Sequence, residues 1–353
     1  MHMSSARTEP IKDALASGEG SLAELHAFLR SGAPWPDEPP PKCIETHASL
    51  VYLTSDRAWK LKKPVRLMHV DQVSFEARAR LCREEFRLNR ALSGGVYRSL
   101  TPLVRRADGS LALGGVGRVV DWLIESLRLP EQEMLDRRLV CGPAPECTEI
   151  EAVCDLLVGF YRRQPQLPDP GAVFYPRLLQ DVETAATHLR EMASATGVPA
   201  PEQTVDFAVA ALKTCREEIV ERARLGLVVE GHGDLRCEHV CLTRPPVVFD
   251  RLEIDHGMRV LDPFYEINAL GLECALQGAG WIRAVMLVKM SYAIAPPSLA
   301  LLTAYGGVAL LTRARLAANH FRDIEVATPA KWRAKTKQNV AAAAQLFAKA
   351  GEI

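Results

Sequence analysis

The stretch Val229-Glu-Gly-His-Gly-Asp-Leu-Arg-Cys-Glu-His-Val-Cys-Leu242, followed by Val247-Val-Phe-Asp250, decides the fold of this chain. A His-Gly-Asp turn lies between two short apolar runs, and a second aspartate closes the strand that follows. Two carboxylates at strand ends suit one kind of chemistry. One can act as a base for a hydroxyl group, and the other can bind a magnesium ion that carries phosphates.

This order of residues resembles the catalytic loop and metal-binding strand of the aminoglycoside phosphotransferase and choline kinase superfamily, whose loop reads His-Gly-Asp-(Leu/Phe)-His-x-x-Asn. In this chain the last position of the loop is His239 instead of asparagine. Further matches at 45–49, 59–64 and 249–253 look like an uncharacterised bacterial branch, some members of which carry a fused P-loop ATPase domain. No Gly-x-x-x-x-Gly-Lys-(Ser/Thr) run occurs here, which excludes that domain from this sequence. The resemblance covers most of residues 40–330.

The resemblance implies that Asp234 is the catalytic base and that Asp250 binds magnesium. Phosphoryl transfer needs little covalent work from a protein, but the attacking hydroxyl must be oriented and its proton accepted. By themselves, Asp234 would also suit the cap of a turn and Asp250 an exposed strand end. Their separation, and the apolar run at 227–229 before the loop, favour the functional interpretation.

His239 leaves three interpretations open. Asparagine offers a hard carbonyl oxygen, whereas a neutral imidazole suits zinc and other transition ions better than magnesium. In the first, His239 still binds a metal; in the second, it donates to phosphate directly; in the third, the second metal site is absent. We expect a metal site that is retained but altered. The resemblance implies that His232 holds the loop by a hydrogen bond. Arg236 is placed with His232 and Asp234 in the catalytic set.

The segment Trp-Lys-Leu-Lys-Lys-Pro at 59–64 is predicted to be the strand that carries the phosphate-binding lysine. Alternation puts Lys60 and Lys62 on one face, and Lys60 matches the family's position better. Its ion-pair partner is expected on the next helix. Glu84 matches the family's Glu-x-x-x-Leu pattern, and Glu85 is the second choice. Without the catalytic loop, these charges would suit an ordinary helix surface.

The segment Glu-Thr-His-Ala-Ser at 45–49 lies where protein kinases carry a glycine-rich phosphate loop, but it contains no glycine. We expect the hydroxyl groups of Thr46 and Ser49 to act as donors to phosphate instead. Residues 121–125, Asp-Trp-Leu-Ile-Glu, are predicted to be the hinge between two lobes, where backbone amides would bind adenine. That placement follows from order along the chain alone.

The apolar pattern of the first 125 residues predicts a helix, a proline-rich linker and a small mixed lobe. The expected elements are a helix at 11–30, a linker at 34–41, strands at 44–53 and 58–61, a helix at 74–92, and strands at 99–105 and 116–124. This order matches the small lobe of a kinase-like fold. We therefore expect an α+β, two-lobed, protein kinase-like fold whose N-terminal lobe contains an antiparallel sheet.

The remainder of the chain is predicted to form a larger, mainly helical C-terminal lobe. The expected helices cover 131–139, 148–163, 175–193, 201–224 and several segments from 264 onward, with breaks at Pro296-Pro297 and Gly306-Gly307. The predicted domains are 1–42 for the helix and linker, 43–125 for the nucleotide-binding lobe, and 126–353 for the helical lobe with the catalytic loop.

Composition narrows the function classes. Lysine plus arginine equals aspartate plus glutamate at 43 each, so no strong field draws the protein to nucleic acid or a membrane surface. Charged residues interrupt each apolar stretch before about 18 residues, so we expect no transmembrane helix. The first residues lack an apolar signal core, and a cytoplasmic location is expected. The sequence gives no indication of the oligomeric state.

Nine cysteines are scattered along the chain, with no Cys-x-x-Cys pair. Most are expected to be reduced, buried small hydrophobes. Cys237, His239 and Cys241 alternate around the loop and suggest soft-metal ligands, but a fourth ligand at a plausible spacing is missing.

The leading hypothesis is a phosphotransferase that uses ATP or another nucleoside triphosphate, with Mg²⁺ or Mn²⁺, to phosphorylate a hydroxyl group of a small molecule. An acidic pocket for a polycationic aminoglycoside would have to draw on Asp255, Glu266 and Glu273. A pseudokinase or nucleotide-binding regulator is one alternative, motivated by the glycine-free segment and His239. A metal-dependent hydrolase is another, but it leaves the lysine and glutamate pair without a role.

Overall fold

The computed structural model describes residues 20–67, 70–322 and 328–351. Contacts divide the chain into two compact units. The N-terminal unit comprises Met1–Pro130 with Val248–Asp255, and the helical unit comprises Glu131–Val247 with His256–Ile353. The predicted helix at 11–30 is observed from Leu22 onward as α1, and residues 11–19 lie outside the described residues.

An antiparallel sheet of six strands forms the centre of the N-terminal unit, in the order β1-β2-β3-β8-β6-β7. Its strands are β1 (Lys42–Glu45), β2 (Ser49–Leu53), β3 (Arg57–Lys62), β6 (Tyr97–Arg105), β7 (Leu111–Leu113) and β8 (Arg118–Leu127). A small hairpin, β4 (Arg66–Leu67) and β5 (Val70–Asp71), precedes α2 (Phe75–Leu92). The run predicted as one strand at 44–53 is two strands, because the chain turns back at 46–48.

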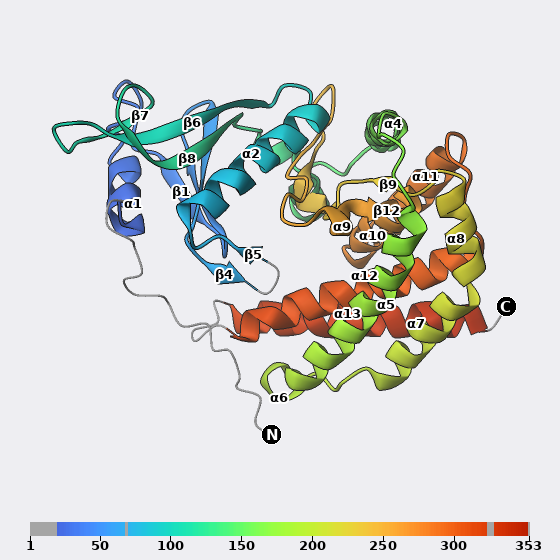
Figure 1. The fold of residues 1–353 in the computed structure, drawn as a ribbon. Helices are drawn as coiled ribbons and strands as arrows, with labels where there is room; N and C mark the ends of the chain where they lie inside the picture. The colour runs from blue at the N-terminus through green and yellow to red at the C-terminus, as the bar shows by residue number, and fades with distance from the viewer. Residues whose placement is uncertain (1–19, 68–69, 323–327, 352–353) are drawn as a thin grey trace. The chain divides into compact units, whose positions relative to one another are not determined.

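Two helices pack on this sheet (Figure 1). Trp59 and Leu61 of β3 belong to the apolar core that includes Leu25 and Leu29 of α1. Helix α2 contacts β8 and β6, and begins where the Ser74 hydroxyl accepts the Ala77 N–H at 3.1 Å. The predicted helix at 74–92 is confirmed to within one residue.

The predicted hinge at 121–125 is wrong. These residues lie inside β8, which pairs with β3 on one side and with β6 on the other. The backbone of residues 123–125 is therefore paired on both sides, whereas Asp121 and Trp122 pair with β6 alone. The side chain of Asp121 forms an ion pair with Arg78 of α2 at 2.9 Å. The first segment of the N-terminal unit ends later in the chain, at Pro130.

The helical unit is built around α5, α7, α10, α12 and α13. Its elements are η1 (Glu131–Glu133), α3 (Leu135–Val140), α4 (Cys147–Arg162), α5 (Pro170–Glu191), α6 (Ala193–Thr196), α7 (Glu202–Thr214), α8 (Arg216–Arg224), β9 (Val229–Glu230), η2 (Cys237–His239), β10 (Val240–Cys241), β11 (Val247–Val248), α9 (His256–Arg259), β12 (Val260–Leu261), α10 (Pro263–Leu276), α11 (Gly280–Ser291), α12 (Leu299–Asn319), η3 (His320–Arg322) and α13 (Pro329–Gly351). At Val248 the chain enters the N-terminal unit, and it leaves that unit after Asp255.

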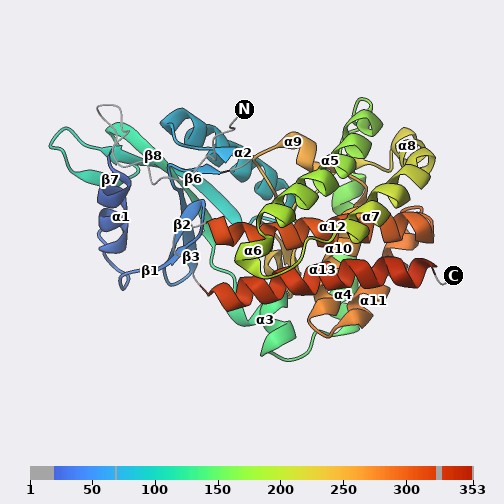
Figure 2. The same cartoon turned by 90° about the horizontal axis from the view of Figure 1, so that it is seen from below.

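Helix α12 is the core helix of this unit and packs along α13 (Figures 1 and 2). The break predicted at Gly306-Gly307 is wrong, since both glycines are buried inside α12. A Cβ atom on Gly306 would lie 2.7 Å from Leu346 of α13, and one on Gly307 would collide with the Phe347 ring. These glycines allow two helices to approach closely. The predicted break at Pro296-Pro297 does separate α11 from α12.

Among the described residues one segment, Leu299–Arg322, is long and apolar enough to span a membrane by length and composition, with a mean hydropathy of 1.2. Charge interrupts this stretch within the expected 18 residues, since Arg313 and Arg315 follow 14 uncharged residues, but two charges do not take the segment outside the criterion of length and composition. Of its most apolar window, 61% is buried inside the protein. The contacts of α12 with α5, α7, α10 and α13 are those of a core helix.

Candidate active site

The predicted site residues fall into two groups, one in each unit, and each group is described by itself. The loop at 231–239 in the helical unit begins after β9, which pairs with β12. Gly231 donates its N–H to the Arg259 carbonyl at 2.7 Å, and a Cβ atom there would lie 2.5 Å from Leu261. Gly233 has a φ of +88°, a region that favours glycine. Both glycines are therefore required by the path of the loop.

A buried carboxylate holds this loop. Glu266 of α10 accepts the backbone N–H groups of His232 at 3.0 Å and of Gly233 at 3.1 Å. It also accepts the Tyr161 hydroxyl at 2.5 Å. Hydrogen bonds to an ionised acceptor are the stronger kind, and here they bind the backbone itself. Glu266 therefore stabilises the loop, and its burial removes it from the acidic pocket for a polycation that the sequence left open.

His232 forms a hydrogen bond inside the loop. Its ring is buried, and its Nδ1 atom accepts the N–H of Asp234 at 3.3 Å. The His239 ring stacks nearly parallel to it, with the centroids 5.7 Å apart. The two histidines and the Asp234 backbone thus form one packed turn.

Asp234 is paired with an arginine that sequence reasoning missed. Arg313 of α12 donates to the Asp234 carboxylate at 2.7 Å and to the Leu235 carbonyl at 3.4 Å. Burial opposes ionisation of Asp234, but nearby positive charge, led by Arg313, outweighs it and lowers the pKa of the carboxyl. Arg313 is 79 residues away in sequence, and its charge, with that of Arg315, in an otherwise apolar helix is the signal that could have found it.

His239 is oriented by the same turn. Its Nδ1 atom lies 2.7 Å from the Asp234 carbonyl oxygen. Since a carbonyl oxygen only accepts, Nδ1 carries the proton and, in the neutral ring, Nε2 carries the lone pair. Histidines that bind metals commonly have their other ring nitrogen held in this way. Nε2 lies 3.9 Å from Glu238.

Arg236 lies beside two glutamates on the outer part of the loop. Its guanidinium is 2.5 Å from Glu238 and 3.9 Å from Glu273. Glu273 of α10 also accepts the Cys237 N–H at 3.2 Å, which ties the loop to α10 a second time. Arg236 therefore contacts carboxylates and not the Asp234 side chain.

The structure gives no support to a soft-metal site. Within residues 20–67, 70–322 and 328–351, no three histidine, cysteine, aspartate or glutamate side chains are grouped to hold a metal ion. The Cys237 sulfur faces Cys274 at 3.5 Å. All nine cysteines are free and six are buried, as the sequence predicts.

The group in the N-terminal unit is centred on a buried glutamate. Glu85 of α2 has no exposed surface and accepts both Lys60 at 2.8 Å and Lys62 at 2.6 Å. Lys60 also contacts Asp250 at 2.9 Å, and Lys62 contacts Glu253 at 2.5 Å. The prediction that the two lysines share one face of β3 is confirmed.

The charges of this group stabilise one another. Burial lowers the pKa of Lys60, but the carboxylates of Asp250 and Glu85 more than reverse this and raise it well above its usual value. Burial raises the pKa of Glu85, but the charges of Lys60 and Lys62 outweigh burial, so the net effect is a lowered pKa. Asp250 has a φ of +61°, which is uncommon outside glycine and recurs at functional sites.

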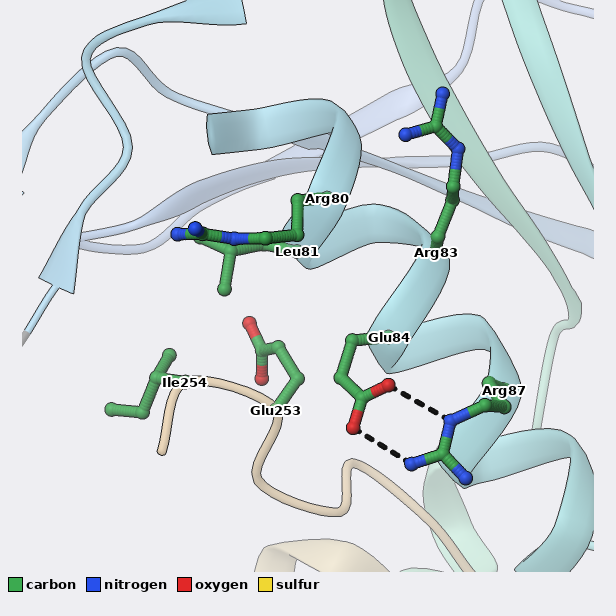
Figure 3. Close-up of a pocket in the computed structure, with 7 residues that line it drawn as sticks. All are labelled: Arg80, Leu81, Arg83, Glu84, Arg87, Glu253 and Ile254. Atoms are coloured by element: carbon green, nitrogen blue, oxygen red, sulfur yellow. Dashed lines mark hydrogen bonds and ion pairs between the residues drawn. The ribbon is translucent and has the colours of Figure 1, made fainter. Parts of the chain in front are cut away.

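The predicted partner of Lys60 is wrong by one residue. Glu84 forms a two-oxygen ion pair with Arg87, at 2.7 and 2.8 Å (Figure 3), and Glu85 contacts Lys60 instead. Successive helical residues differ by about 100° in direction, so only one of two adjacent glutamates can face the sheet. Glu84 instead lines an open cavity of about 420 Å³ on the surface of α2, together with Glu253 and Ile254.

Thr46 and Ser49 are occupied with each other at the turn between β1 and β2. The Thr46 hydroxyl accepts the Ser49 N–H at 3.0 Å and donates to the Ser49 carbonyl at 3.1 Å. Ser49 is 2% exposed. The Thr46 hydroxyl therefore closes a turn, and Ser49 is buried, so the arrangement does not support the expectation that these two hydroxyls donate to phosphate.

No model of a protein family matches the chain. Proteins described as uncharacterized, from Mycobacterium tuberculosis (strain H37Rv) and Mycobacterium bovis, are 27% identical over 252 residues, which is 69% of this chain. The chain spans about half the length of these curated relatives, 48%. Nothing in their names supports the fused P-loop domain expected of some relatives.

Solved structures give the fold. A choline kinase from Cryptosporidium parvum Iowa II aligns with a TM-score of 0.51 and 10% identity, covering 93% of this chain and 96% of that one. The GDP and kanamycin complex of APH(2")-IIia aligns at 0.47 and 14%, covering 93% and 100%. The predicted α+β kinase-like fold, with an antiparallel-sheet unit and a mainly helical unit, is confirmed.

Proposed function

We propose that the protein transfers a phosphoryl group from a nucleoside triphosphate, ATP in the first instance, to a hydroxyl group of a small molecule. The observation that carries the proposal is the cluster of Lys60, Glu85 and Asp250. A lysine held between a helix carboxylate and a strand-end carboxylate is suited to bind phosphate oxygens. The fold is similar to that of a choline kinase from Cryptosporidium parvum Iowa II.

In this proposal Lys60 binds the nucleotide phosphates and Glu85 keeps the lysine in place. Asp250 offers hard carboxylate oxygens of the kind that Mg²⁺ or Mn²⁺ prefers, and so would hold the cation. When bound, that cation neutralises charge on the phosphates. His239 is the candidate for a second contact, to the metal or to phosphate.

Asp234 accepts a hydrogen bond from the acceptor hydroxyl. Arg313 holds one carboxylate oxygen, which fixes the rotation of the side chain and leaves the other oxygen for the hydroxyl. A carboxyl with a lowered pKa is a weak base, so its main contributions are orientation and acceptance of the proton late in the reaction. Arg236 and His232 hold the loop in place, through carboxylates and through the Asp234 N–H respectively. We place this reaction in the cytoplasm.

The test is transfer of labelled phosphate from ATP with magnesium, measured for the wild type and for Asp234→Asn. We expect nucleotide binding to persist in the variant and transfer to fall by roughly 10²–10⁴-fold. Asp206→Asn, on the exposed surface of α7, is the matched control and is expected to retain full activity. Equal turnover by Asp234→Asn and wild type would refute the assignment.

A nucleotide-binding regulator is the second candidate. Two observations favour it: Thr46 and Ser49 are committed to their own turn, and Lys60 is already bonded to Asp250. Nucleotide binding without transfer, in the wild type as in Asp234→Asn, would support the regulator over the enzyme.

A further inference from the structure

Two cysteine side chains meet where the catalytic loop contacts α10. Cys237 is the first residue of η2 in the loop, Cys274 lies near the end of α10, and their sulfur atoms are 3.5 Å apart. Neither side chain has exposed surface. Among the described residues, no other two cysteine sulfurs lie within hydrogen-bonding distance of each other, so this pair is distinct from the remaining cysteines.

The two segments that carry these sulfurs are also joined by hydrogen bonds. Glu273 accepts the Cys237 N–H at 3.2 Å, and Gln277 donates to the Cys237 sulfur at 3.7 Å. The main chain and the side chain of Cys237 are therefore both held against the last part of α10. A reaction between the two sulfurs requires no distant segments to meet, so the entropy of closing a loop is already lost in the folded protein.

The two sulfurs are close enough for a disulfide to form with a small local movement. The S–S bond of a disulfide is about 2.05 Å long, so the sulfurs would have to approach by about 1.5 Å. Cys274 lies inside a helix, whereas Cys237 belongs to a loop between two short strands. Most of the movement is therefore expected on the side of the loop.

Reactivity at this pair comes from proximity and not from thiolate character. The contact with Cys274, and then burial, raise the pKa of the Cys237 thiol, so the reactive thiolate is rare at neutral pH. A first oxidation is therefore slow, and it requires a small oxidant and local opening of the loop. The next step is fast, because the partner sulfur is only 3.5 Å away and acts at a high effective concentration.

We propose that Cys237 and Cys274 form an oxidation site, at which hydrogen peroxide converts the two thiols into a reversible disulfide that ties the loop to α10. In the first step one sulfur bonds to a peroxide oxygen, the O–O bond breaks, and a sulfenic acid and one water are formed. In the second step the other sulfur attacks the sulfenic sulfur, the S–O bond breaks, and a second water leaves. The thiols lose two protons and two electrons, and the peroxide is reduced to water.

The oxidation of this pair does not depend on the proposed function, but its consequence for phosphoryl transfer rests on it. Cys237 lies between Asp234 and His239 in the chain. A covalent bond at Cys237 restricts the movement of the loop that carries the proposed base. In a reducing compartment a disulfide of this kind is transient, which suits a sensor of oxidant.

The chemical test is peptide mapping of the full chain after exposure to hydrogen peroxide, extended to about a hundredfold beyond that which oxidises the exposed Cys141. Free thiols are alkylated in denaturant, and the digest is analysed by mass spectrometry without reduction. We expect one main intramolecular disulfide, between Cys237 and Cys274, which dithiothreitol reverses. Cys82 and Cys215, which are buried without a sulfur neighbour, should be alkylated as free thiols. A different main intramolecular disulfide, or recovery of the pair as thiols or sulfinic acids, overturns the proposal.

Two variants locate the reaction. Cys274→Ser removes the partner sulfur, so no main disulfide is expected at Cys237. Cys215→Ser, which replaces a buried thiol at the end of α7 in the same unit, is the matched control and should form the disulfide as the wild type does. Equal yields of a disulfide at Cys237 in the two variants would contradict the assignment of Cys274 as the partner.

Hydrogen exchange measures the bond between the loop and α10. In the oxidised wild type, the backbone amides of residues 235–239 should exchange at least about tenfold more slowly than in the reduced protein, because the disulfide restricts local opening. Dithiothreitol should reverse this change, and peroxide should not produce it in Cys274→Ser. Equal exchange rates in the oxidised and reduced wild type would overturn the proposal.

The oxidation site and the proposed function fail separately, because neither mapping nor exchange uses nucleotide or acceptor. A protein that forms the disulfide between Cys237 and Cys274 but neither binds nucleotide nor transfers phosphate retains the site and loses the function. A protein that transfers phosphate, with Asp234→Asn inactive, but forms no such disulfide does the reverse.

Discussion

The two charge clusters of this protein, one in each unit, are stabilised in different ways. In the N-terminal unit, Lys60 and Lys62 share Glu85, so one side chain bonds to another. In the helical unit, Glu266 accepts the backbone N–H groups of His232 and Gly233. The first arrangement fixes side chains that retain rotatable bonds, and the second fixes the path of the main chain.

This difference has a consequence for binding. Lys60 forms an ion pair with Asp250, so phosphate binding must compete with that ion pair. The loop around Asp234 has no such rearrangement to make, since its backbone is held by a carboxylate beneath it. In terms of the proposed reaction, the loop is preorganised and the lysine cluster is adjustable.

The largest effect is expected for Glu266→Gln. A glutamine presents one acceptor oxygen, and its amide hydrogens would face the N–H groups of the loop. Loss of the negative charge of the acceptor, and of one of its two oxygens, should lower the free energy of unfolding by about 5 kcal/mol. Urea denaturation measures it, with Tyr161→Phe as control, which removes only the hydroxyl bond to Glu266. Equal losses in the two variants would contradict backbone anchoring as the main role.

A smaller effect is expected for Glu85→Gln. The change removes the charge shared by Lys60 and Lys62, but Asp250 and Glu253 still contact the two lysines. We expect the free energy of unfolding to fall by roughly 3 kcal/mol, the lower limit for breaking a buried pair. Nucleotide affinity should fall as well, because Lys60 loses its support. A stability loss as large as that of Glu266→Gln would remove the contrast between the clusters.

Mild acid should affect the helical unit through His188 of α5. Burial first, then the charges of Arg322 and Arg315, lower the pKa of this histidine to about 4. Neither ring nitrogen has a hydrogen-bond partner among the described residues. Between the unfolded value of about 6.5 and the folded value the unfolded state binds the extra proton, so stability falls as pH falls. From pH 7 to pH 5 the loss is about 2 kcal/mol.

The variant His188→Leu should remove this pH dependence while keeping the site apolar and filled. Urea denaturation at pH 7, 6 and 5 measures the slope for both proteins. Between pH 7 and pH 5 the variant is expected to lose about 2 kcal/mol less unfolding free energy than the wild type. An unchanged slope would mean that other groups dominate the acid response. The paired carboxylate of Glu85, whose pKa is lowered, loses its contribution only below the usual range of a carboxyl group.

Local patterns in the sequence predicted much of the fold, but not which surfaces meet. The helix at 74–92 was predictable from apolar spacing and a capping serine. Choosing Glu84 over Glu85 followed the family pattern and ignored that spacing. Glu85 lies on the buried stripe with Leu81, Leu88 and Leu92, at intervals of three and four residues, and this placed it on the inner face.

Other features depend on contacts between distant segments. Gly306 and Gly307 suggest a helix break in the sequence, but their role is to allow α13 to pack closely against α12. The role of Arg313 likewise depends on the contact of α12 with the loop at Asp234. Local propensity contains no information on such contacts. The prediction of a hinge at 121–125 was wrong for a related reason, because order along the chain does not reveal where a strand ends.

The smallest effect is expected for Glu84→Gln, which differs from Glu85→Gln by one position. Glu84 forms an ion pair with the exposed Arg87 three residues later on the same helix. Such surface pairs contribute little, so the free energy of unfolding should change by less than about 0.5 kcal/mol, with nucleotide affinity unchanged. The two variants carry the same substitution on adjacent residues of one helix. If Glu84→Gln lost nucleotide binding and Glu85→Gln kept it, Lys60 would take its support from Glu84 in the working protein, as the family pattern predicts.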